Sequence, residues 1–347
     1  MRLGLRGLVR GQGGTIPSSQ RAEDGTEAGT YRSPFLKLHG PRSPHRLLDR
    51  LTAQQISLIQ TVALGDTDYL SRSFYQDPAS GKRIARELER KELAQFSSSW
   101  KADPVHCIRA MNLAIARIPE GEGARRERYV RAAVDLEVLM DRQSRSGPSG
   151  RVYKGIPGYL MNGYTDMGSL PSVTARNGRE KIKVDKERVR GRLVACKRRV
   201  VSRGVTEELL EHFYSAVRRD IKFNEVGVDK LFREYGDRSI ALSRYLDLGL
   251  GVCRHLSIFL QLYLQEAGID SRLIKGNLKF FVFSGRHAWN LARLGKRVAL
   301  IDVTHPDVNQ PFILWGDSPE EVYQRAGSVS RSYVATRNDQ NHYKIGA

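Results

Sequence analysis

One stretch of the chain has the apolar spacing of a mostly buried helix. It begins just after a turn at Gly249–Gly251 and stops at Ala267-Gly268, a typical helix end. We therefore expect Cys253 to lie in the first turn of this helix. The apolar positions that define it are Leu256, Ile258, Phe259, Leu260, Leu262, Tyr263 and Leu264.

After this helix the pattern changes to short apolar runs, which are typical of antiparallel strands. Gly295-Lys296 predicts a tight hairpin that leads into a strand over residues 297–303. The hairpin would bring His287 and Asp302 onto neighbouring strands. The other expected elements are strands at 271–276 and 279–284, a turn at Gly285-Arg286, and a strand from His287 to Ala292.

Elsewhere helical patterns dominate, broken by one long connector. Helix starts are expected at Thr52, Lys82, Asp103 and Thr206, and an apolar stripe from Tyr129 to Met140 indicates a further helix. Near the end of the chain we expect an edge strand over residues 312–315 and a short helix capped by Ser318. The predicted organisation is a leader (1–46), a helical domain (47–143), a linker and basic connector (144–204), a mixed domain (205–316) and a loose C-terminal tail (317–347).

Cys253, His287 and Asp302 together indicate a nucleophilic site. A helix N-terminus stabilises a thiolate, which is the nucleophilic form of cysteine. The imidazole of His287 would accept the thiol proton, and the carboxylate of Asp302 would orient the imidazole. Taken singly, a buried cysteine, a core histidine and a turn-forming aspartate are ordinary packing features. Their order along the chain favours the catalytic interpretation.

The same residues carry a family resemblance. The motifs GxGVCRHxxxFLQxxLxxAGIxSRLIxG, HAWN and IDVTHP resemble the core of the transglutaminase-like branch of papain-like cysteine enzymes. Within that group they are most similar to the peptidase-like domain of plant enhanced-disease-resistance kinases and scattered bacterial proteins. The resemblance implies an α+β fold over residues 205–316, in which a helix bearing Cys253 packs on an antiparallel sheet bearing His287 and Asp302. It also implies Cys253 as nucleophile, His287 as base and Asp302 as orienting acid.

Such a site would transfer acyl groups through a thioester and act on protein or peptide amides. Peptidase, deamidase and transglutaminase activity all follow from this chemistry, with hydrolysis preferred. The backbone N–H of Cys253 would contribute to an oxyanion hole, with Asn224 a candidate second donor. Trp289 would shield the site, and His255 is interpreted as structural. No cofactor is expected, and no metal site or calcium loop is evident.

Composition limits the class of protein. The chain has 347 residues, of which 40% are hydrophobic and 27% charged, as in soluble globular proteins, and no stretch is long and apolar enough to span a membrane. The formal net charge is +19, and residues 176–203 hold twelve Lys and Arg against three acids. This connector predicts contact with an acidic protein or nucleic acid, or else an ordinary solvated face.

Two alternatives from other classes remain open. The first is an inactive binding module that keeps this fold and uses the basic surface to hold a partner. The second is an ADP-ribosyltransferase, since Arg151–Gly155 followed by Ser169–Ser172 faintly resembles the opening of that family. No Glu-x-Glu motif follows on a strand, because Glu207, Glu208 and Glu211 fall in a helical pattern.

The three cysteines form no disulfide framework or metal pair, and a working thiol favours a reducing compartment such as the cytoplasm. Cys107 is interpreted as packing, and Cys196 lies among charges that would make it moderately acidic. Residues 1–46 have no signal-peptide core. A flexible tail, an organelle transit peptide and the leader of a bacterial effector translocated into a host cell all fit them.

Overall fold

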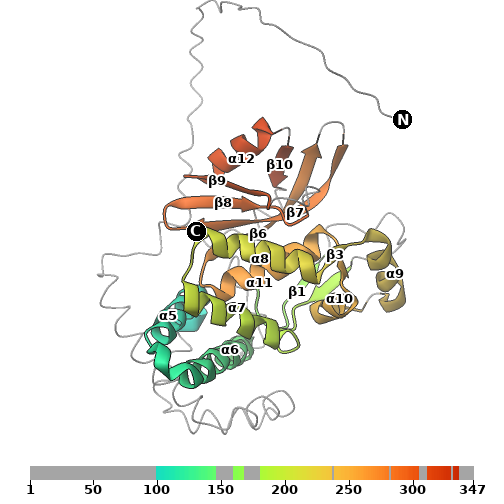
Figure 1. Cartoon of the computed structure of the whole chain (residues 1–347). Coiled ribbons are helices and arrows are strands. Elements are labelled where there is room, and N and C mark those ends of the chain that lie inside the picture. The colour runs from blue at the N-terminus through green and yellow to red at the C-terminus, as the bar shows by residue number, and fades with distance from the viewer. Residues whose placement is uncertain are drawn as a thin grey trace, which may run out of the picture. The chain divides into compact units, whose positions relative to one another are not determined.

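A five-stranded antiparallel sheet separates one helix near the end of the chain from the main group of helices (Figure 1). The computed structural model describes residues 99–145, 159–167, 180–236, 238–280, 283–304, 311–329 and 331–335, all within the unit Arg42–Ala347. The described residues combine helices with an antiparallel sheet, which agrees with the predicted α+β class. The predicted leader and the helices expected at Thr52 and Lys82 lie outside them.

The sheet has the strand order β10-β6-β7-β8-β9, so the last strand within the described residues lies at one edge. Two short parallel pairings lie apart from it: β2 (Lys181–Lys183) with β4 (Ile240–Ala241), and β3 (Lys222–Phe223) with β5 (Leu250–Gly251). A third short strand, β1 (Thr165–Met167), pairs antiparallel with β2. The strands of the main sheet are β6 (Asp270–Phe280), β7 (Phe283–Leu294), β8 (Arg297–Ile301), β9 (Ile313–Gly316) and β10 (Arg331–Ala335).

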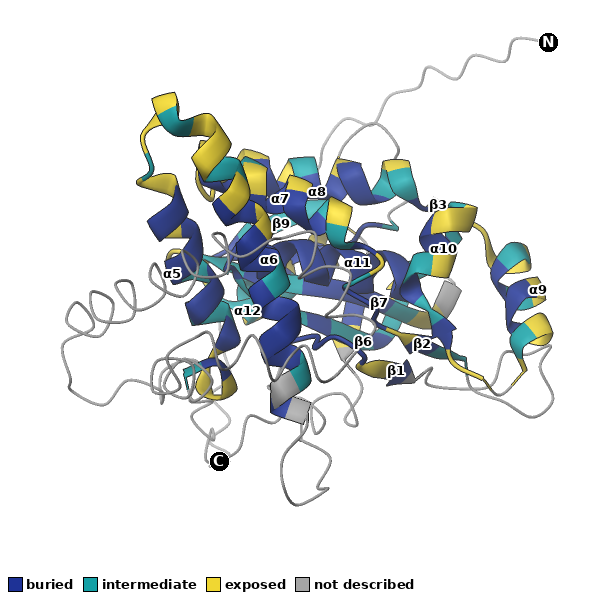
Figure 2. Ribbon diagram, turned by 90° about the horizontal axis from the view of Figure 1, so that it is seen from below, coloured by how far each residue is buried: buried dark blue, intermediate teal, exposed yellow. Residues whose placement is uncertain are grey.

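The expected buried helix is α11 (Cys253–Glu266), which ends at Gly268 with a positive φ of 69°. Figure 2 shows that α11 is buried along nearly its whole length, whereas the helices around it expose one side. The surrounding helices are α5 (Pro104–Ala116), α6 (Gly123–Arg145), α7 (Arg190–Arg203), α8 (Glu207–Asp220), α9 (Glu225–Tyr235) and α10 (Leu242–Leu248), with a 3₁₀ turn at Glu120–Glu122.

The alternation of side chains along the strands separates two apolar layers. Ala288, Ala299 and Ile301 face the large core shared by α5 to α11. Trp289 and Leu300 point to the opposite face, where they pack with residues of α12 (Pro319–Ser328) and β10. Helices from the predicted helical domain and from the predicted mixed domain therefore contribute to one continuous core.

Local capping explains where several helices begin. Asp103 accepts a hydrogen bond from the His106 N–H at 2.9 Å, Thr206 from the Leu209 N–H at 3.3 Å, and Ser318 from the Glu321 N–H at 3.2 Å. Each cap confirms a predicted helix start. The hairpin at Gly295 and the edge strand after Pro311 are also confirmed.

Three expectations about the elements are wrong. Gly285-Arg286 is not a turn, because β7 continues through it and Gly285 pairs with Leu278 in the register of β6 and β7. The described part of the C-terminal segment is not loose, since it forms α12 and β10. The apolar pattern that Leu113 shares with Ile108 and Met111 predicts that it faces inward, but Leu113 is 53% exposed.

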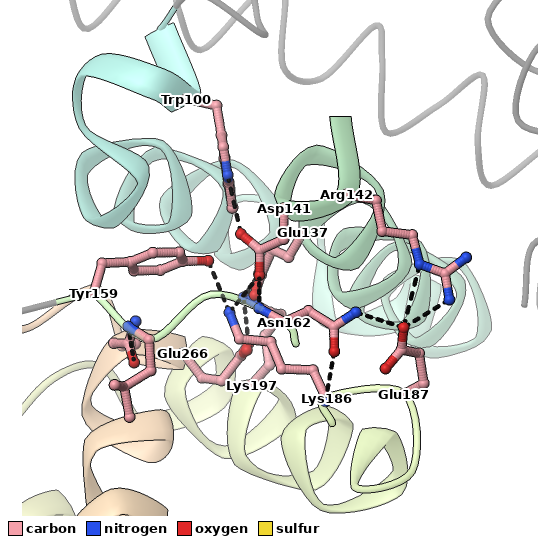
Figure 3. Close-up of polar contacts among 12 residues, drawn as sticks. Trp100, Glu137, Asp141, Arg142, Tyr159, Asn162, Lys186, Glu187, Lys197 and Glu266 are labelled. Carbon is pink, nitrogen blue, oxygen red and sulfur yellow. Dashed lines mark hydrogen bonds and ion pairs between the residues drawn. The ribbon is translucent and has the colours of Figure 1, made fainter. Parts of the chain in front are cut away.

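A buried ionic cluster joins α5, α6, α7 and α11 (Figure 3). The Lys197 ammonium lies 2.6 Å from Glu137 and 3.2 Å from Glu266, and it donates to Asn112 at 3.1 Å. Burial, and then the charge of Glu266, raise the pKa of Glu137 well above its usual range. Lys197 is therefore an internal cation at the end of α11, and the expectation that it contributes to a surface patch is wrong.

A second lysine of the connector is also internal. The Lys186 ammonium lies 2.9 Å from Asp141 and 2.8 Å from the Tyr159 hydroxyl, and its side chain is 1% exposed. Asp141 also accepts from the Asn162 backbone N–H at 2.8 Å. These contacts attach the segment before α7 to α6, so part of the basic connector is structural.

We predict that Lys197→Met lowers the free energy of unfolding by about 3–5 kcal/mol, because it leaves two buried carboxylates without their cation. Arg198→Met, at the next position of α7, is the matched control: its partner Glu127 and Arg198 itself are solvent-accessible, and such pairs contribute about 1 kcal/mol or less. Urea unfolding of both variants measures the difference. Equal losses in the two would contradict this role of Lys197.

Candidate active site

The turn before Cys253 is held by a short parallel strand pair. The Lys222 N–H donates to Gly249 and the Asn224 N–H donates to Gly251, at 2.9 and 2.8 Å. At Gly251 an added Cβ would lie 2.7 Å from Cγ2 of Ile221 and 2.9 Å from Cβ of His255. The chain can therefore enter α11 at this angle only with glycine at position 251.

Cys253 is the first residue of α11, and its side chain is half-buried. No side chain caps the helix at Val252, so the dipole and the first N–H groups of α11 act on the groups around the thiol. This is the expected placement of Cys253. An anionic sulfur or a developing oxyanion is favoured at such a helix end.

His255 stabilises the turn that precedes Cys253 through hydrogen bonds. Its Nδ1 accepts the Val252 N–H at 3.1 Å, so Nε2 carries the proton that is donated to Glu180 at 3.1 Å. Glu180 also accepts from the Arg254 guanidinium and the Tyr245 hydroxyl, both at 2.5 Å. His255 is fully buried. The interpretation of His255 as structural agrees with this geometry.

His287 and Asp302 meet across the β7–β8 hairpin. Nε2 of His287 lies 2.8 Å from Oδ2 of Asp302, which leaves Nδ1 for a partner on the other side of the ring. Asp302 follows directly after β8, and its backbone N–H donates to Phe312 at 3.2 Å. The predicted neighbouring positions of the imidazole and the carboxylate are therefore present in the structure.

The Asp302 carboxylate is buried, with 1% exposed, and accepts four hydrogen bonds. Oδ2 accepts from His287 and from the Tyr333 hydroxyl, the latter at 2.7 Å. Oδ1 accepts from the backbone N–H and the hydroxyl of Thr304, at 3.1 and 2.9 Å. Burial alone would raise the pKa of Asp302, but the bonds from His287, Tyr333 and Thr304 lower it. The carboxylate is thus ionised and fixed in direction.

The Asp302 carboxylate changes the pKa of the His287 imidazole. Burial would lower its pKa, but the hydrogen bond and charge of Asp302, followed by interaction with the Cys253 side chain, raise it from 6.5 to about 10. His287 therefore carries a proton through the neutral pH range. A protonated imidazole beside a thiol at a helix N-terminus is the arrangement that stabilises a thiolate.

Trp289 lies two residues further along β7, on the same face of the strand as His287. The two rings are nearly parallel, with an interplanar angle of 20° and centroids 6.3 Å apart. Trp289 is fully buried, and its indole N–H donates to the Tyr323 hydroxyl at 3.2 Å. It packs beside the imidazole, as expected of a shielding residue.

Asn224, the candidate second oxyanion donor, lies near the site but is engaged in capping a helix. The Asn224 side-chain oxygen caps α9 by accepting the Gly227 N–H at 2.8 Å, next to the turn before Cys253.

Burial raises the pKa of Cys107 to about 12 and that of Cys196 well above its usual range. Cys107 is a packing residue, and the expectation of a moderately acidic Cys196 is wrong. Arg151 and Ser169–Ser172 lie outside the described residues.

In the described ranges no group of three or more His, Cys, Asp or Glu side chains is arranged to hold a metal ion. None of the described helices has the length and apolar character needed to cross a bilayer. Glu207, Glu208 and Glu211 lie on or beside the first turns of α8, as expected from their helical pattern.

The sequence analysis missed Tyr333, Thr304 and Glu180. Thr304 stands in the motif that contains Asp302, and its local Asp-x-Thr spacing is typical of a side chain that hydrogen-bonds a carboxylate two residues earlier. Residues 331–335 contain Tyr333-Val334, a pair of residue types that favour strands, which was the available signal for Tyr333. Glu180 reaches His255 across 75 positions, and nothing local indicates that contact.

Comparison with known proteins adds no assignment. No protein-family model matches the chain, and no curated protein is significantly similar to it.

We predict that Asp302→Asn lowers the pKa of His287 well below 10. The neutral amide removes the largest contribution that holds the proton, so the burial of the ring is then opposed by the interaction with Cys253 alone. An NMR titration of the His287 ring measures the change. Ionisation of His287 near pH 10 in the variant would contradict the prediction.

The same pair makes stability depend on pH. Because the folded pKa of His287 lies above its ordinary value of 6.5, its stabilisation is fully present below pH 6.5 and is lost as pH rises towards 10. The free energy of unfolding of the parent should therefore exceed that of Asp302→Asn by about 3–5 kcal/mol near pH 6 and by much less near pH 10. Denaturant unfolding at the two pH values measures this. A difference that does not change with pH would count against the ion pair.

Proposed function

We propose that this protein is a cysteine-dependent acyl-transfer enzyme that acts on protein or peptide amides. Cys253 is the nucleophile, His287 the acid–base and Asp302 the orienting carboxylate. The observation that carries the proposal is the buried Asp302 carboxylate, 2.8 Å from Nε2 of an imidazole whose pKa is also raised by Cys253. The fold around these residues is proposed to be the transglutaminase-like core that the sequence motifs resemble.

The residues support a two-step reaction. The Cys253 thiolate attacks the carbonyl carbon of the amide, and the backbone N–H of Cys253 donates to the oxygen that becomes negative. His287 then gives its Nδ1 proton to the leaving nitrogen, and the C–N bond breaks to leave a thioester. Water or a second amine, deprotonated by His287, attacks the thioester and releases Cys253.

Peptidase, deamidase and transglutaminase activity share these steps and differ in the amine that leaves and in the acceptor. We propose hydrolysis as the default outcome, because water is the acceptor always present. A working thiolate at Cys253 also favours a reducing compartment, and we propose the cytoplasm of the producing cell or of a host cell that receives the protein.

One observation favours the alternative of a binding module. His212 on α8 has its pKa lowered by burial and then by the charges of Arg199, Arg219 and Arg203, so these cations gather on one surface. Such a surface would hold an acidic protein or nucleic acid, with binding that falls steeply as salt concentration rises. This function needs no reactive thiol, so the reactivity of Cys253 distinguishes the two.

The test is the alkylation rate of Cys253 by iodoacetamide as a function of pH, with the modified residue identified by peptide mass spectrometry. We predict that the parent stays reactive well below pH 7, because a protonated His287 stabilises the thiolate. In His287→Ala the rate should fall about tenfold for each pH unit below a free-thiol pKa of about 8.5. Cys107 and Cys196 stay protonated and unreactive over this range.

His212→Ala provides the matched control, since it removes a half-buried histidine from α8 and should leave the alkylation profile of Cys253 unchanged. If the parent and His287→Ala show the same pH profile, the proposed function is wrong. The salt dependence of binding to acidic partners would then become the relevant measurement.

A further inference from the structure

Tyr333 reaches the candidate active site from the last described strand of the chain. It lies on β10, which pairs with β6 so that Tyr333 stands opposite Leu278. Its side chain is buried, with 6% of the residue exposed. The ring packs edge-on against Trp289, with centroids 5.1 Å apart, and lies 6.1 Å from the His287 ring. The phenol is therefore enclosed with the imidazole on one face of the sheet.

The Tyr333 hydroxyl donates to Oδ2 of Asp302 at 2.7 Å, the same oxygen that lies 2.8 Å from His287. An ionised carboxylate can only accept, so the phenol must be the donor. Hydrogen bonds to charged groups are about twice as strong as those between neutral groups. The bond therefore stabilises the anion and restricts the rotation of the carboxylate that His287 needs as a fixed partner.

We propose that Tyr333 is a positioning residue of the acyl-transfer site: its hydroxyl keeps the Asp302 carboxylate ionised and aimed at His287. This inference rests on the proposed function and extends it to a segment outside the motifs that indicated the site. It also assigns a role to α12 and β10, because these elements hold the ring of Tyr333 against Trp289. The C-terminal segment is thereby part of the catalytic architecture.

Few titratable groups act on this carboxylate. His287 approaches from β7 and Tyr333 from β10, while Thr304, which follows β8, contributes two uncharged donors. Cys253 of α11 acts on His287, whose pKa it raises. None of the largest contributions to the pKa shift of Asp302 comes from a charged group of β9 or α12. Loss of the Tyr333 hydroxyl should therefore raise the pKa of Asp302 without a compensating donor.

Tyr333→Phe tests the inference, because it removes the hydroxyl and keeps the ring that packs on Trp289. Tyr323→Phe is the matched control: its hydroxyl accepts from Trp289 at 3.2 Å, whereas the hydrogen bonds to the Asp302 carboxylate come from His287, Tyr333 and Thr304. The first readout is the carboxyl-carbon chemical shift of Asp302 during an NMR pH titration, assigned with Asp302→Asn. We expect the pKa of Asp302 to rise by about one unit in Tyr333→Phe and to stay unchanged in Tyr323→Phe.

The second readout is the acid side of the Cys253 alkylation profile. Protonation of Asp302 removes the counter-charge of the imidazolium. The pH at which Cys253 alkylation falls off on the acid side should therefore rise by about as much as the pKa of Asp302 rises, in Tyr333→Phe but not in Tyr323→Phe. A merely structural role would change the melting temperature without moving the limb. Parent-like carboxyl titration and acid limb in Tyr333→Phe would overturn the inference and leave the proposed function standing.

A different result marks failure of the proposed function itself. If alkylation of Cys253 does not depend on His287 in the parent, acyl transfer is ruled out, and the role of Tyr333 in it is overturned with it. The carboxyl titration then reports only on the ionisation of Asp302 in the fold.

Discussion

The buried carboxylate of Asp302 is the constraint on which the site depends. Removing an anion from water is costly unless its acceptor positions are filled, and here all of its partners are supplied by His287, Tyr333 and Thr304. These donors come from β7, β10 and the turn after β8, so the charge is tolerated only when the sheet is assembled. The same four bonds fix the direction of the carboxylate and so the orientation of the imidazole.

Helix α11, which begins with Cys253, is held by buried charges at both ends. At its start, Glu180 accepts from Arg254, from His255 and from Tyr245, which fixes the turn that carries Cys253. At its end, Glu266 contacts Lys197 from α7, together with Glu137 from α6. Buried ion pairs contribute little net stability compared with apolar packing, but losing one partner is costly. Their consequence here is geometric, because α11 cannot slide or rotate against the helices that surround it.

The parts of the site that could be predicted from sequence are those fixed by local chemistry. A glycine turn before an apolar helix placed Cys253, and the Gly295 hairpin placed His287 near Asp302, because both signals act within a few residues. The long β6–β7 pair was missed because Gly285 resembles a break until its partner strand is known. Lys186 and Lys197 resembled surface charges, since their partners lie far away in the chain. The contact of Tyr333 with the site could be predicted only with knowledge of which strand covers Trp289.

The most direct test of the account is acyl-enzyme formation. The parent and His287→Ala would be incubated with p-nitrophenyl acetate, quenched in acid, and mapped by peptide mass spectrometry before and after hydroxylamine. The account predicts a single acetyl group on Cys253 of the parent, removed by hydroxylamine as expected for a thioester, and little or none on the variant. Acetylation confined to lysines, or equal on Cys253 in both proteins, would contradict a thiolate activated by His287.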